Sequence, residues 1–175
     1  MTWYITSTLI AATVCLGFVV SKETSLARLV QHRPVPEIAA HQVRQKQLDF
    51  ETRLQQARRY GAPEPTPDFV LVDVRSPDET KISVIPNALT IGQFEAQRET
   101  FRHRIIICYC TVGVRSEEYA YQLRETRFNA WNFKGSILEW CQQGFPLQTL
   151  DGQPTNRVHT YSSDYSVPPA YRAVW

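Results

Sequence analysis

The 175-residue chain lacks the residue patterns that mark a metal site or a nucleic-acid surface. Its four cysteines stand at positions 15, 108, 110 and 141, with no Cys-x-x-Cys pair and no histidine at zinc-ligand spacing. The net charge is only +2, and no basic stripe interleaves with aromatic residues. We therefore expect a globular protein with no metal, no cofactor and no nucleic-acid partner.

Charged residues are absent from Trp3 to Val20, a run of 18 residues. As a helix this run would span about 27 Å, close to the hydrocarbon thickness of a bilayer. No basic residue precedes the run, whereas Lys22 and Arg28 follow it. The positive-inside rule then predicts a single-pass membrane helix over residues 1–21, in contact with the membrane through residues 3–20, with the following domain in the cytoplasm. The alternative is a short hydrophobic helix packed on that domain.

The remainder of the chain divides into three segments. Residues 22–67 contain a charged helix over residues 37–60, with an incomplete apolar stripe, and then the proline-rich linker 61–67, so they predict a juxtamembrane spacer. Strand and helix patterns alternate over residues 68–150, which indicates a parallel α/β sheet. Residues 151–175 carry too many aromatic residues for a solvated tail, so we expect this extension to pack on the domain. The expected strands are 69–74, 88–89, 105–109 and 129–132, and the expected helices are 116–126 and 136–142.

Cys110 follows the apolar strand 105–109 directly and opens a short turn that ends at Ser116. We predict Ser116 as the N-cap of the next helix, because serine accepts hydrogen bonds from the free N–H groups of a first turn. A helix N-terminus favours an anion, so the pKa of the Cys110 thiol should lie below its usual value near 8.5. Cys108, one residue before the strand end, is interpreted as a core residue.

Four motifs, in this order, resemble those of the rhodanese-like sulfurtransferases. Residues 69–79 resemble a strand that ends in Asp-Val-Arg with a glutamate shortly after, and residues 85–88 resemble an Ile-Pro-Gly-Ala segment with Asn87 in place of glycine. The spacing Cys110-x-x-Gly113-x-Arg115-Ser116 resembles the active-site loop, and residues 132–146 resemble the closing segment. The resemblance implies an α/β fold with a rhodanese-like parallel sheet flanked by helices over residues 68–150.

The length of the cysteine loop separates two chemistries. Tyrosine-phosphatase loops place arginine six positions after the cysteine, which leaves room for a phosphoryl group. Here Arg115 is five positions after Cys110, so the smaller ring favours a single bound sulfur.

The resemblance implies that Cys110 is the catalytic nucleophile and carries a persulfide. Thr111, Val112, Gly113, Val114, Arg115 and Ser116 would supply backbone N–H groups to the substrate, with the Arg115 side chain attracting an anionic donor. Asp73 and Arg75 are candidate substrate-binding residues, but we interpret them as mainly structural: Arg75 could form an ion pair with Glu79, and Asp73 could line the pocket.

Two functions remain open from the sequence. The first is a sulfurtransferase that moves a sulfane sulfur from thiosulfate or a persulfide donor, which includes a protein persulfide, to a thiol or cyanide acceptor. The second is a membrane-tethered rhodanese-like binding module with little or no turnover.

Overall fold

The computed structural model describes residues 34–175. Within this range no helix is long and apolar enough to cross a membrane. The predicted membrane span at residues 3–20 lies outside the described residues, so it stays a prediction.

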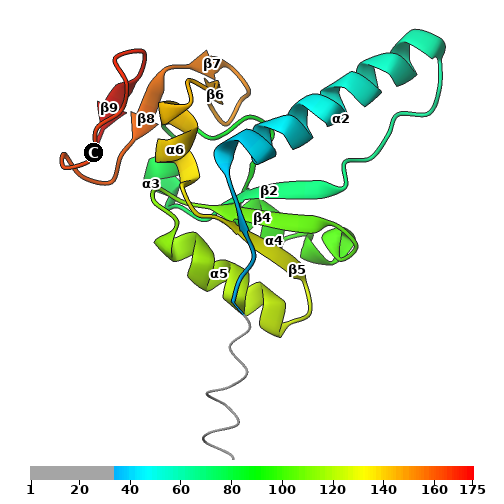
Figure 1. Ribbon diagram of the computed structural model, residues 1–175, viewed down its shortest axis with the longest axis horizontal. Coiled ribbons are helices and arrows are strands. Elements are labelled where there is room, and N and C mark those ends of the chain that lie inside the picture. The colour runs from blue at the N-terminus through cyan, green and yellow to red at the C-terminus, as the bar shows by residue number, and fades with distance from the viewer. Residues whose placement is uncertain (1–33) are drawn as a thin grey trace, which may run out of the picture. The chain divides into compact units, whose positions relative to one another are not determined.

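A five-stranded sheet with the order β1-β5-β4-β2-β3 forms the centre of the structure (Figure 1), and all its neighbouring strands are parallel. The central strand β4 is rich in isoleucine and buried on both faces, as is typical of a parallel sheet covered by helices. The predicted α/β parallel sheet is therefore confirmed. The strands are β1 (Glu37–Ile38), β2 (Phe69–Asp73), β3 (Leu89–Thr90), β4 (Ile105–Tyr109) and β5 (Asn129–Phe133).

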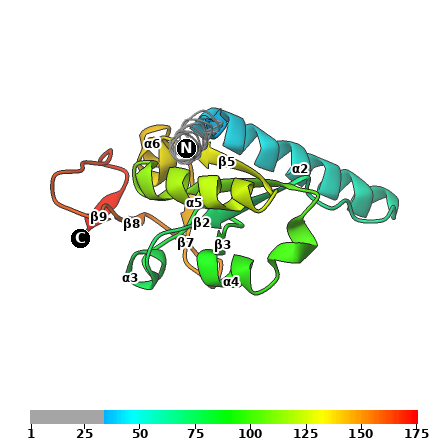
Figure 2. The same cartoon turned by 90° about the horizontal axis from the view of Figure 1, so that it is seen from below.

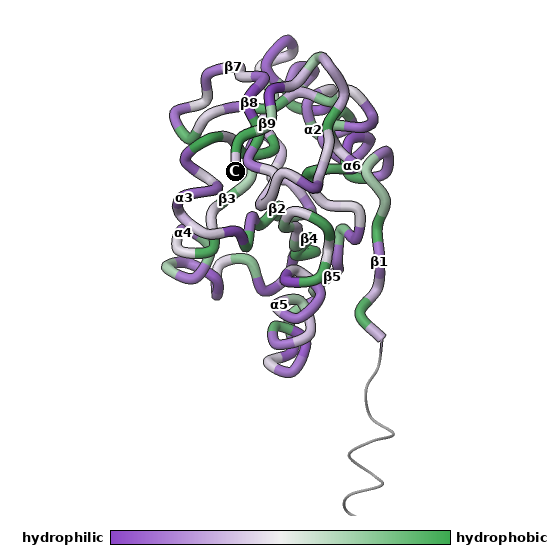
Figure 3. Tube along the Cα trace, turned by 90° about the vertical axis from the view of Figure 1, so that its left-hand side faces the viewer, coloured by the Kyte–Doolittle hydropathy of each residue, from purple (hydrophilic) through white to green (hydrophobic). Residues whose placement is uncertain are grey.

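Helices cover both faces of the sheet (Figures 1 and 2). Ala40 of α2 and Trp140 of α6 belong to one hydrophobic cluster, whereas Phe94 of α4 and Leu123 of α5 belong to the other. Figure 3 shows hydrophobic residues concentrated on the central strands between these layers. The helices are α2 (Ala40–Tyr60), α3 (Pro77–Thr80), α4 (Ile91–Glu95), the 3-10 helix η1 (Arg98–Phe101), α5 (Val114–Glu125) and α6 (Ser136–Gln142).

The sheet and core include residues upstream of position 68, where the sequence analysis placed the start of the domain. β1 pairs with β5 through Glu37 and Ile38, which were expected to be helical. Helix α2 buries Ala40, Val43 and Gln47 in its first turns and becomes exposed toward its end. The incomplete apolar stripe of this segment thus reflects a helix that packs on the domain only at its beginning.

The C-terminal extension packs on the domain, as predicted. Val158 is fully buried in the core, and the Tyr171 hydroxyl donates a 2.6 Å hydrogen bond to the carbonyl of Phe145. β8 contacts α3, near the site described below (Figures 1 and 2). The strands of this part are β6 (Leu147–Gln148), β7 (Pro154–Thr155), β8 (Arg157–His159) and β9 (Arg172–Val174).

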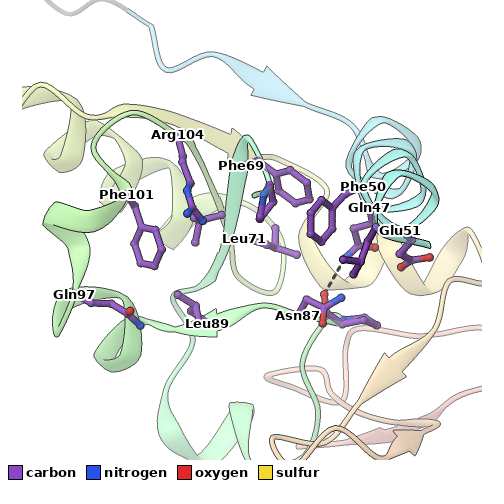
Figure 4. Close-up of a pocket in the computed structure, with 14 residues that line it drawn as sticks. Gln47, Phe50, Glu51, Phe69, Leu71, Asn87, Leu89, Gln97, Phe101 and Arg104 are labelled. Atoms are coloured by element: carbon purple, nitrogen blue, oxygen red, sulfur yellow. Dashed lines mark hydrogen bonds between the residues drawn. The ribbon is translucent and has the colours of Figure 1, made fainter. Parts of the chain in front are cut away.

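A mostly apolar cavity of about 450 Å³ lies between α2, β2 and η1 (Figure 4). Phe69, Leu71 and Leu89 line it, and Arg104 lies between Phe101 and Phe69. None of its lining residues is a cysteine or a histidine. The cavity therefore holds no nucleophile of the kind that the sequence analysis singled out.

Candidate active site at Cys110

Cys110 lies in the turn between β4 and α5, at the carboxyl end of the central strand. Gly113 is the N-cap of α5 and has a φ of 94°, a left-handed conformation that favours glycine. The helix begins at Val114, so the prediction that Ser116 is the N-cap is wrong. Ser116 lies in the first turn and is fully buried. The earlier start brings the positive end of the helix closer to the cysteine.

The Cys110 sulfur faces hydrogen-bond donors of its own turn. The Gly113 backbone N–H donates to Sγ at 3.1 Å, and the Ser116 hydroxyl lies 3.6 Å from Sγ. Burial raises the pKa of the Cys110 thiol, but hydrogen bonds from the Ser116 hydroxyl and from the backbone of Ser116, Gly113 and Val112 outweigh it and lower the pKa below its ordinary value. The turn therefore favours the thiolate, which is the nucleophilic form of cysteine.

The N-terminus of α6 holds the cysteine turn in place. The backbone N–H of Cys110 donates to Ser136 Oγ at 3.0 Å, and the N–H of Ile137 donates to the Cys110 carbonyl at 3.2 Å. A Cβ at Gly113 would lie 2.0 Å from the carbonyl oxygen of Lys134, so the two segments approach too closely for a side chain. The segment before α6 and the cysteine turn thus form one tightly fitted unit.

A buried asparagine on β5 accepts a hydrogen bond from the Ser116 hydroxyl and holds this side chain behind the turn. Asn132 Nδ2 donates to the Gly113 carbonyl at 3.1 Å, and Ser116 Oγ lies 2.7 Å from Asn132 Oδ1. Sequence reasoning missed this role of Asn132, because neither the strand pattern nor the spacing of the motifs indicates which side chains meet behind the turn.

Arg115 forms an ion pair with Glu79 of α3. Its guanidinium donates two hydrogen bonds of 2.7 Å to the two Glu79 carboxylate oxygens and a third of 3.0 Å to Thr111 Oγ1. Burial raises the pKa of Glu79, but hydrogen bonds from Arg115 and Ser76 outweigh it and lower the pKa to about 2. Glu79 is therefore ionised at neutral pH, and the pair as a whole carries no net charge.

The predicted ion pair between Arg75 and Glu79 is wrong. Arg75 instead binds Asp73, with 2.7 Å between Arg75 Nη2 and Asp73 Oδ2, and both side chains are completely buried. Arg75 also donates to the Ser83 carbonyl at 2.6 Å. Neither Asp73 nor Arg75 lines the pocket at Cys110, so the expectation that they bind substrate is not met: they satisfy each other inside the domain.

A pocket of about 250 Å³ opens above the cysteine turn. Two of its walls come from the C-terminal extension, at Tyr161 and Tyr165. The Tyr161 ring covers the Arg115 guanidinium, with 5.5 Å from its centroid to Cζ. The sequence signalled these tyrosines only through the aromatic density of the extension, and it gave no indication that they face Cys110. The pocket is lined by Cys110, Thr111, Val112, Val114, Arg115, Tyr161 and Tyr165.

The other cysteines of the described range are core residues. Cys108 and Cys141 are fully buried. Burial raises the pKa of both thiols, that of Cys141 to about 12. Within residues 34–175 no group of three or more histidine, cysteine, aspartate or glutamate side chains could hold a metal ion. In this part of the chain, Cys110 is the cysteine that combines a pocket with a lowered pKa.

Comparison with known proteins identifies a family. The model of the family described as "Rhodanese-like domain" matches residues 56–143, about half of the chain. The matched range contains both halves of the Glu79–Arg115 pair and the whole cysteine turn, but it leaves out the extension that carries Tyr161 and Tyr165.

Similar proteins match between about half and two thirds of the chain. A protein named "Sulfurtransferase" from Allochromatium vinosum is 31% identical over 91 residues, which cover 50% of this chain and 85% of that protein. A tRNA uridine(34) hydroxylase from Enterobacter sp. is 30% identical over 103 residues, but the match spans only 28% of its length. A solved structure of a rhodanese-like domain protein from Staphylococcus aureus is 24% identical, with a TM-score of 0.46 over 65% of this chain and 97% of that one.

Proposed function

Because the chain belongs to the rhodanese-like domain family, we propose that it is a sulfurtransferase that carries a sulfane sulfur on Cys110. Thiosulfate or a persulfide would be the donor, and a thiol or cyanide the acceptor. The observation that carries the proposal is the 3.1 Å hydrogen bond from the Gly113 N–H to the Cys110 sulfur, at the floor of an open pocket.

The proposed reaction has two steps at one sulfur. The Cys110 thiolate attacks the outer sulfur of the donor, so a new S–S bond forms while the donor's own bond to that sulfur breaks. The leaving group departs with the electron pair, as sulfite from thiosulfate or as a thiolate from a persulfide. An acceptor thiolate or cyanide then attacks the outer sulfur of the Cys110 persulfide and regenerates the Cys110 thiolate.

The turn suits this chemistry because it stabilises negative charge without a base. Backbone N–H groups and the start of α5 face the sulfur, and they can equally stabilise the charge on a terminal persulfide sulfur. A histidine base is not needed when the thiolate is already favoured.

Intact mass spectrometry tests the proposal. Full-length protein in detergent is incubated with thiosulfate and, separately, with a persulfide donor, and we expect a gain of one sulfur atom. Cys110→Ser should abolish the gain, whereas Cys108→Ala, the matched control, should retain it. An unchanged mass with every donor contradicts the proposal and favours the binding module.

We also propose that residues 3–20 tether this domain to a membrane, with the domain in the cytoplasm. The support is the uncharged run and the basic residues that follow it. In intact cells, a C-terminal tag should resist external protease and should stay in the membrane fraction after alkaline carbonate extraction. Release of the protein by carbonate would contradict the tether. Digestion of the tag from outside would contradict its orientation.

A further inference from the structure

The pocket at Cys110 has little free positive charge that could attract an anionic donor. Arg115 is the one cationic side chain among its lining residues. That guanidinium already binds both carboxylate oxygens of Glu79 at 2.7 Å, and the Tyr161 ring lies over it. A dianion that approached the sulfur would therefore meet a neutral ion pair rather than a free cation.

The mouth of the pocket is instead apolar and aromatic. Val114 is 70% exposed and Tyr161 65% exposed, and Val112 and Tyr165 are exposed beside them. Exposed hydrophobic side chains that cluster around a pocket commonly mark a binding surface, and tyrosine provides a large contact area at a low entropic cost. A ligand with an apolar group would gain free energy by burying this rim.

We propose that Tyr161 and Tyr165 make this rim a recognition surface for sulfur donors that carry an aromatic or apolar group and a single negative charge, in preference to the thiosulfate dianion. The proposal rests on the proposed sulfurtransferase function and specifies its donor. It assigns a role in donor specificity to the C-terminal extension, which lies outside the part of the chain that the family model matches.

Thiosulfate and benzenethiosulfonate form a matched pair of donors for the test. Benzenethiosulfonate has a phenyl ring where thiosulfate has one of its charged oxygens. In both cases the Cys110 thiolate takes the terminal sulfur and the S–S bond of the donor breaks. Sulfite leaves from thiosulfate and benzenesulfinate leaves from benzenethiosulfonate, each with the electron pair, so the charge balances. The two donors differ in intrinsic reactivity, so each loading rate is divided by the rate with a small free thiol.

The variants Tyr161→Ala and Tyr165→Ala should lower the loading rate of Cys110 with benzenethiosulfonate about tenfold, because the phenyl ring loses an apolar surface to bury. Their rates with thiosulfate should fall by a clearly smaller factor, because thiosulfate has no apolar group to bury against the rim. Tyr161→Phe should keep the wild-type rate with both donors, since it keeps the ring. Tyr60→Ala is the matched control, an exposed tyrosine at the end of α2 that does not line the pocket.

Each result decides the proposal. If the alanine variants slow both donors equally, or neither, the rim does not select donors and the proposal is wrong. If benzenethiosulfonate fails to load the wild type while thiosulfate or a persulfide succeeds, the donor proposal is wrong and the sulfurtransferase function stands. If no donor of any kind loads Cys110, both are wrong.

Discussion

Cys108 lies inside strand β4 and Cys110 lies one residue beyond its end, and these two thiols have opposite environments. Hydrophobic side chains surround Cys108, and burial raises its pKa. Cys110 is almost as buried, yet the N–H groups of its turn lower its pKa. The comparison teaches that burial alone makes a thiol inert, whereas burial together with aligned donors produces a nucleophile.

The two ion pairs near β2 also differ in their exposure. Asp73 and Arg75 are completely enclosed, so their charges hold the chain together inside the domain. Glu79 is almost as buried, but its partner Arg115 remains 39% exposed at the pocket. One pair therefore lies wholly inside the domain, whereas the other has one member, Arg115, at the active-site pocket.

The largest expected difference between the two thiols is in alkylation. At neutral pH, iodoacetamide should modify Cys110 at least about 10³-fold faster than Cys108, because Cys108 reacts only when the domain opens. Since the pKa of Cys110 is lowered, its rate should reach half of its maximum at a pH below about 8.5.

Peptide mapping by mass spectrometry across pH 5–10 measures both rates. If the alkylation rate of Cys110 reaches half of its maximum only at a pH of about 8.5 or above, its thiol is not activated and this contrast with Cys108 is wrong.

A side chain at Gly113 should abolish most of the extra reactivity of Cys110. Gly113→Ala places a Cβ 2.0 Å from the Lys134 carbonyl oxygen at a φ of 94°, so the turn must move and its N–H group must leave the sulfur. We expect persulfide loading to fall about 100-fold, which corresponds to about 3 kcal/mol, and the alkylation midpoint of Cys110 to rise.

Gly61→Ala is the matched control, because Gly61 also has a positive φ of 63° but no atom lies within 4 Å of its Cβ position. It should lower the free energy of unfolding by about 1 kcal/mol, measured in urea, and leave loading unchanged. Wild-type loading in Gly113→Ala would show that the turn does not activate the thiol.

Removal of the Ser116 hydroxyl should have the smallest effect. Ser116→Ala removes a hydroxyl that lies 3.6 Å from Sγ but 2.7 Å from Asn132 Oδ1, so the loss at the sulfur is at most that of one hydrogen bond, about 1 kcal/mol, and alkylation of Cys110 at neutral pH should slow no more than about fivefold. Cys108 should be unaffected. The control Thr100→Ala, which removes an exposed hydroxyl from η1, should change the alkylation rate of neither cysteine. If Ser116→Ala also leaves the alkylation rate of Cys110 unchanged, the backbone N–H groups are the source of its lowered pKa.

Local patterns in the sequence predicted much of the fold. The isoleucine run of β4 and the seven residues of α6 have the predicted bounds, since each is set by hydrophobic periodicity and short-range signals. β1 was missed because a two-residue strand has no periodicity, and it forms only where β5 offers an open edge.

Taken alone, the sequence determined the parallel α/β sheet, the position of Cys110 at the end of a buried strand and the glycine that its turn requires. These features depend on residues close together in the chain, where conformational preferences act directly. Only the tertiary structure decided the partners of Arg75 and Arg115, the contact of Asn132 with Ser116 and the placement of Tyr161 and Tyr165 over the pocket. Each of these joins side chains from elements distant in sequence, and which charges and rings meet depends on how the packed layers fit together.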